Sequence, residues 1–139
     1  MKKFLSLILA VAMLCALTLT LTSCGELTLE GTYQGAFFLD EKDTLTITFK
    51  EGNVVEMTLV DGTATYKATG TYKIEADTTE GHDHQLMSFD IKGDIGTLSY
   101  LQNVSYAYSL EEVDGQKQLA LSSHGGTVTQ NMTFTEVKK

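Results

Sequence analysis

The chain has 139 residues, with 18 acidic side chains against 10 basic ones and a formal net charge of −8. It contains no proline, tryptophan or arginine. An anionic surface repels nucleic acid. Without arginine, the chain also lacks the side chain that most often binds phosphate through two parallel hydrogen bonds. The composition therefore predicts neither nucleic-acid binding nor phosphoryl chemistry.

The first 21 residues carry the features of an export signal. Lys2 and Lys3 are followed by an uncharged stretch from Phe4 to Leu21, rich in Leu, Ala, Val and Thr. This order of a basic and then an apolar segment is typical of a signal peptide, which we expect to be helical. The stretch is also just long enough to cross a membrane, so an uncleaved N-terminal anchor is the alternative.

The segment Leu21-Thr22-Ser23-Cys24 follows directly. It resembles the lipobox of bacterial lipoproteins, in which an aliphatic residue and two small residues precede a cysteine. The resemblance implies a diacylglyceryl thioether on Cys24, cleavage between Ser23 and Cys24, and a membrane as the partner of the lipid. It places the protein on the extracytoplasmic side of a membrane, and Gly25 leaves the outer membrane open as a destination.

Cleavage would divide the chain into a signal peptide (1–23), a short tether (24–30) and one domain (31–139). The tether residues 25–30 span at most about 20 Å, so we expect the domain close to the bilayer. The mature chain keeps 8 lysines and all 18 acidic residues, a net charge of −10, and Cys24 as its one thiol. No disulfide, cysteine nucleophile or resident cofactor is predicted.

Beyond Gly31 the apolar residues alternate with polar ones, which is the signature of β-strands. Leu45, Ile47 and Phe49 alternate with threonines, and after the turn at 51–53 a second run at 54–60 does the same. Asp61-Gly62 and Asp114-Gly115 indicate tight hairpins, as does the segment 124–126. Further strand-like runs lie at 63–68, 71–76, 85–91, 97–101, 104–113, 117–122 and 127–137.

About ten short runs must hide their edges, which favours an all-β fold, either an antiparallel meandering barrel or a β-sandwich. Gly31-Thr32-Tyr33, a second Gly-Thr-Tyr at 70–72 and the closing segment Thr133-Phe134-Thr135 look like the small lipocalin-like lipoproteins of bacteria. The resemblance covers residues 30–137 and implies a β-barrel that could hold a small apolar ligand.

His82-Asp83-His84 is a candidate metal site, because two imidazoles and a carboxylate suit zinc or copper. It lies in the longest expected loop, from Asp77 to His84, so the competing interpretation is a solvated polar loop. The set Ser122-Ser123-His124 is better explained by a hairpin turn than by a hydrolase, and no catalytic residue is predicted.

Five tyrosines could line a ligand cavity or a protein-binding face, since each ring joins an apolar body to a polar tip. They are Tyr66, Tyr72, Tyr100, Tyr106 and Tyr108. The alternative is that they simply fill the barrel.

The sequence thus predicts a membrane-anchored, non-enzymatic binding module for a small apolar or amphipathic ligand. An envelope interaction or structural protein with a solid barrel is the alternative, and a metal-binding protein is the third possibility.

Overall fold

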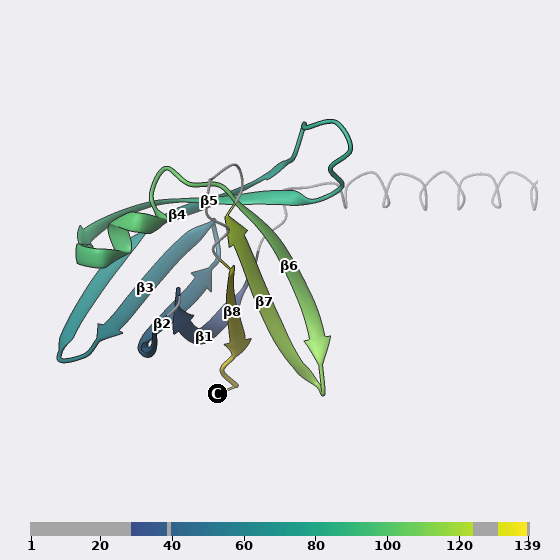
Figure 1. The fold of residues 1–139 in the computed structure, drawn as a ribbon. Helices are drawn as coiled ribbons and strands as arrows, with labels where there is room; N and C mark the ends of the chain where they lie inside the picture. The colour runs from purple at the N-terminus through teal and green to yellow at the C-terminus, as the bar shows by residue number, and fades with distance from the viewer. Residues whose placement is uncertain (1–28, 39, 124–130, 139) are drawn as a thin grey trace, which may run out of the picture.

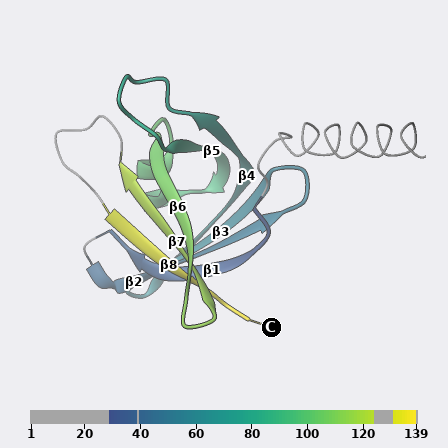
Figure 2. The same cartoon turned by 90° about the vertical axis from the view of Figure 1, so that its right-hand side faces the viewer.

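Eight antiparallel strands close into one barrel in the computed structural model, which describes residues 29–38, 40–123 and 131–138. The elements are β1 (Gly31–Phe37), β2 (Asp40–Lys50), β3 (Val54–Asp61), β4 (Ala64–Ala76), β5 (Gln85–Asp94), the 3-10 helix η1 (Gly96–Leu101), β6 (Tyr106–Val113), β7 (Gln116–Ser123) and β8 (Asn131–Glu136). Each strand pairs with the next, and β1 pairs with β8 (Figures 1 and 2). The predicted all-β fold is confirmed as a meandering barrel rather than a sandwich.

Some sequence-based predictions fall on residues that the structure does not describe. They are the signal peptide helix, the cleavage and lipidation site at Ser23 and Cys24, and the turn at 124–126. Among the described residues, no helix is both long and apolar enough to cross a membrane.

The interior of the barrel is filled by the apolar residues that alternate along the strands. Leu45, Ile47 and Phe49 of β2 are at most 2 % exposed, and the alternating residues of β3 are buried to the same degree. Tyr33 of β1 and Phe134 of β8 complete the core on the other side of the barrel, where these two strands pair. The predicted apolar faces of β2 and β3 are therefore confirmed as the inward faces.

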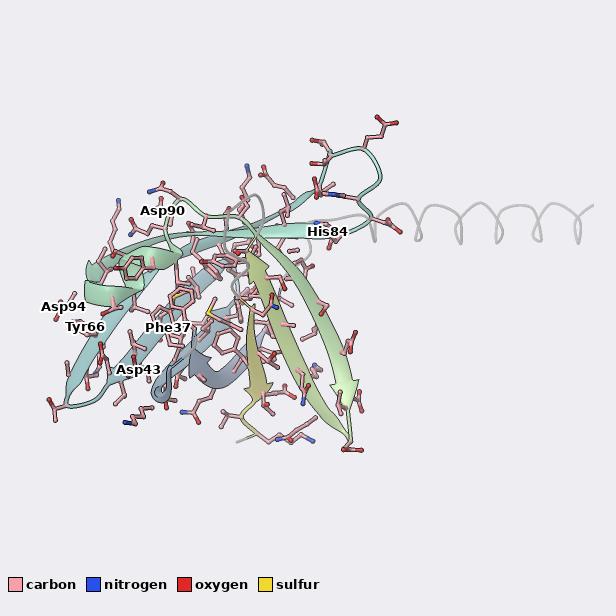
Figure 3. All side chains as sticks on the ribbon, in the orientation of Figure 1. Phe37, Asp43, Tyr66, His84, Asp90 and Asp94 are labelled. Carbon is pink, nitrogen blue, oxygen red and sulfur yellow. The ribbon has the colours of Figure 1, made fainter. Side chains whose placement is uncertain are left out.

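The two ends of the barrel differ in what they carry. One end, here called the entry end, holds Leu29, the turn at 51–53, the β4–β5 loop (77–84) and the β6–β7 turn (114–115). The opposite end, the far end, holds Phe38, the β3–β4 turn and η1. Figure 3 shows Phe37 and Tyr66 on one side of the molecule and His84 on the other.

The hairpin turns follow the predicted residues. Asp114 and Gly115 both have positive φ angles, 53° and 75°, as a tight turn between right-twisted strands requires. The runs predicted at 63–68 and 71–76, in contrast, merge into the single long strand β4, which passes through Gly70. At Gly70 the strand approaches β5 so closely that an added Cβ would collide with the Asp90 carbonyl oxygen.

The strand predicted at 97–101 is wrong, because this segment forms η1. A 3-10 helix has three residues per turn, so Leu98 and Leu101 point to the same side, and both are fully buried. The Leu98 N–H donates to the carbonyl oxygen of Ile95 at 2.6 Å and begins the helix. The spacing of the two leucines was the signal for a helix that alternation alone did not reveal.

Replacement of Gly70 by alanine tests the close approach of β4 and β5. The new Cβ would also lie 2.8 Å from the Cα of Ile91, so the strands must separate. We expect Gly70→Ala to lower the free energy of unfolding by about 2 kcal/mol in denaturant titrations. Thr71→Ala, at the exposed neighbouring position, is the control and should change it by less than about 0.5 kcal/mol. Equal stability of the two variants would contradict the close approach.

Candidate functional site

β5 and β6 pair over only three residues of β5, from Gln85 to Met87, so strand pairing leaves part of the barrel wall between them incomplete. On the far-end side of this pairing, β5 is covered by the segment after η1, where the Gln102 side-chain amide donates to the carbonyl oxygen of Ile91. On the entry-end side, β6 runs on past the start of β5, and the two strands diverge in Figure 1.

A surface groove of about 770 Å³, here called the β5–β6 groove, opens where the strands diverge. Its lining residues are Leu29, Asp83, His84, Gln85, Tyr108, Ser109 and Leu110. The hydroxyl of Tyr108 donates to the side-chain oxygen of Gln85 at 2.7 Å and joins the two sides. Because Leu110 keeps 39 % of its surface exposed, the groove combines open apolar surface with polar groups.

Leu29 is held at the groove by one tyrosine from the barrel interior. The Leu29 N–H donates to the hydroxyl of Tyr72 at 2.7 Å, and the same hydroxyl donates to the Leu29 carbonyl oxygen at 3.2 Å. Tyr72 itself is only 3 % exposed and packs edge-on against Phe49. The chain therefore enters the barrel at a fixed point beside the β5–β6 groove.

The β4–β5 loop brings together three side chains, here called the Asp77 cluster: Asp77, His82 and His84. His82 Nδ1 hydrogen-bonds to Asp77 Oδ2 at 2.8 Å, and His84 Nε2 lies 2.9 Å from the same oxygen. The two imidazole rings stack with their centroids 5.1 Å apart. The other carboxylate oxygen, Oδ1, accepts the Thr79 N–H at 2.9 Å, so Asp77 is fixed by its own loop.

Of the three residues predicted as a metal site, His82 and His84 come together and Asp83 does not join them. Asp83 is exposed on the rim of the groove, and the carboxylate beside the imidazoles belongs to Asp77, whose side chain is only 2 % exposed. Sequence reasoning missed Asp77 because it is five residues from His82. The backbone bond from Asp77 N–H to the His84 carbonyl oxygen, 3.2 Å, closes the loop and brings it there.

The five predicted tyrosines lie in different parts of the barrel. Tyr106 is fully buried, Tyr72 holds Leu29, and Tyr108 lines the β5–β6 groove. Tyr66 packs against Gly96 of η1, where its ring leaves no room for a Cβ. Tyr100 is 66 % exposed at the far end.

The far end carries a second feature, an aromatic pair formed by the partly buried Phe38 and the exposed Tyr100. The ring of Phe38 meets that of Tyr100 edge-on, with centroids 6.3 Å apart, and also contacts Phe37. Phe38 has a φ angle of 55°, which is unusual for a bulky residue. Such backbone strain is often found at functional sites.

Burial changes the acidity of the tyrosines. It raises the pKa of Tyr106 to about 12, and its hydroxyl donates to the Tyr100 carbonyl oxygen at 3.4 Å. The pKa of Tyr108 is also raised, first by burial and then by the nearby Tyr72. Neither phenol is therefore suited to act as a proton acceptor near neutral pH.

No protein-family model, curated protein or solved structure matches the chain.

The raised pKa of Tyr106 predicts a loss of stability in alkali. Above pH 10 the unfolded chain loses the phenol proton while the folded chain keeps it to about pH 12, so the free energy of unfolding falls across this window. Tyr106→Phe should remove on the order of 2 kcal/mol of that fall, measured by urea unfolding at pH 9 and pH 11.5. The exposed Tyr100→Phe is the control, and an unchanged pH slope in Tyr106→Phe would refute the assignment.

Proposed function

We propose that the protein is a lipoprotein anchored through Cys24 to the extracytoplasmic side of a bacterial membrane. We propose further that its barrel is a non-enzymatic binding module, which holds a small amphipathic ligand in the β5–β6 groove. The observation that carries the proposal is the position of this groove beside Leu29, where the chain from the lipid site enters the barrel.

The length of the tether supports a site close to the bilayer. Leu29 follows Cys24 by five residues, which span at most about 18 Å when fully extended. Two or more acyl chains on Cys24 would give a stable anchor. An amphipathic molecule that leaves the membrane would then meet the groove at once.

The lining of the groove supports the chemical class of the ligand. Leu29, Leu110 and the ring of Tyr108 offer apolar contact, while His84 and Gln85 offer polar groups. Asp83 at the rim and the acidic domain disfavour an anionic head group. The apolar side chains that fill the barrel favour this surface groove over a lipocalin-like site inside the barrel.

The aromatic pair of Phe38 and the exposed Tyr100 supports a second candidate, an envelope interaction protein with a solid barrel. Aromatic residues are enriched where proteins bind one another. With the entry end near the bilayer, this pair would point away from it and could meet a protein partner.

The lipid anchor has a direct test. We expect Cys24→Ser to abolish incorporation of labelled palmitate, because the serine hydroxyl is a far weaker nucleophile than the cysteine thiol. Lipid-modified protein should then no longer be found in the membrane fraction. Cys15→Ser, in the predicted signal peptide, is the matched control and should keep both. Palmitate labelling that survives Cys24→Ser would disprove the lipoprotein proposal.

Photocrosslinking in living cells separates the two binding functions. Benzoylphenylalanine at position 110 in the β5–β6 groove should give a small-mass adduct by intact mass spectrometry, whereas position 60, an exposed valine on the outer wall, should not. The same group at position 100 should give a protein adduct only if the second candidate is right. Adducts at positions 110 and 100 no more frequent than at position 60 would contradict both functions.

A further inference from the structure

The Asp77 cluster has the ligands and the spacing of a metal site, independent of what the β5–β6 groove binds. It offers one carboxylate oxygen and two imidazole nitrogens, and these ligand atoms all lie within 4.8 Å of one another. Around Zn²⁺, nitrogen and oxygen ligands stand at about 2.0 to 2.2 Å, which places neighbouring ligands about 3.3 Å apart. Small shifts of the two rings would be enough to admit an ion.

Burial of the Asp77 carboxylate favours the binding of a cation by the cluster. The Asp77 side chain is only 2 % exposed, and a carboxylate taken out of water is costly unless positive or hydrogen-bonding groups compensate it. One of its oxygens is held by the Thr79 N–H, which leaves Oδ2 facing both imidazoles. A divalent ion between these three groups would offset the charge of the buried carboxylate.

The donor set also selects the kind of ion. Calcium takes six to eight oxygen ligands, and magnesium prefers carboxylates and water in an octahedron, so neither suits two imidazoles. Imidazole with a single carboxylate suits Zn²⁺, and Cu²⁺ binds such donors still more strongly. Three protein ligands leave a fourth position, which the exposure of His82 makes accessible to water.

We propose that Asp77, His82 and His84 bind one Zn²⁺ ion through Oδ2, Nδ1 and Nε2, respectively. The ion would fix the β4–β5 loop at the entry end of the barrel. His84 also lines the β5–β6 groove, so the ion would lie at the border of that groove with one coordination position open. Asp83, although it stands between the two histidines in the sequence, takes no part.

Calorimetric titration of the full chain tests the proposal, with the protein purified in detergent, stripped with a chelator and free of affinity tags. We expect one Zn²⁺ per chain and no saturable binding of Mg²⁺. His82→Ala and His84→Ala should each weaken Zn²⁺ binding by at least about 10-fold. Because His82 is exposed, its replacement should leave the barrel folded, which circular dichroism checks.

Two matched controls separate this site from general binding by histidines and acids. Asp83→Asn and His124→Ala should keep the affinity within about 3-fold, whereas Asp77→Asn should weaken it as the histidine variants do. Nitrogen-15 spectra of the imidazoles should show the Nδ1 atom of His82 and the Nε2 atom of His84 shifting on addition of Zn²⁺. Affinity that survives His82→Ala and His84→Ala, or that depends on Asp83 instead of Asp77, would overturn the proposal.

Discussion

Closure of the barrel depends on how closely β1 and β8 approach each other at Gly35. The two strands pair over only three residues, and a Cβ at Gly35 would collide with the Thr133 carbonyl oxygen. This pairing joins the first strand to the last and so leaves no outer strand of the meander without a neighbour. It also brings Phe134 against the β1 side of the interior, where the apolar faces of all the strands meet. The absence of a side chain at Gly35 therefore allows β1 and β8 to pair and the core to be enclosed.

The second short pairing, between β5 and β6, has the opposite consequence. Here the wall is not completed by the strands alone, and Gln102, which follows η1, covers the far-end part of β5. The entry-end part stays open and forms the groove. The β5–β6 groove and the β4–β5 loop thus lie where the regular sheet is interrupted, while the paired strands supply a rigid frame. Binding residues are commonly found on loops that such a scaffold positions.

Structural features that follow from local sequence patterns were predicted, whereas features that depend on contacts between distant parts of the chain were missed. Alternation identified the inward faces of β2 and β3, and Asp114-Gly115 identified a turn, because both are local rules. The helix η1 was missed because its two buried leucines serve the core of a barrel that the local pattern does not describe. Asp77 was missed for the same reason, since a loop closed by one backbone bond brings it to His82. The roles of the tyrosines, from the fully buried Tyr106 to the exposed Tyr100, were equally beyond a linear pattern.

The hydrogen bonds between the Tyr72 hydroxyl and the Leu29 backbone fix the point at which the chain enters the barrel. With the proposed lipid on Cys24, they would therefore also set the orientation of the domain at the membrane. The entry end would face the bilayer, and it carries the exposed acids Glu30, Glu51, Glu80 and Asp83. These charges would be repelled by anionic head groups and would attract cations to the narrow space between the barrel and the membrane. Small molecules and ions would then be bound at the entry end, beside the bilayer, whereas Phe38 and Tyr100 would be presented outward to proteins. The two hydrogen bonds between the Tyr72 hydroxyl and Leu29 would thus determine which end of the barrel faces the bilayer and which end faces outward.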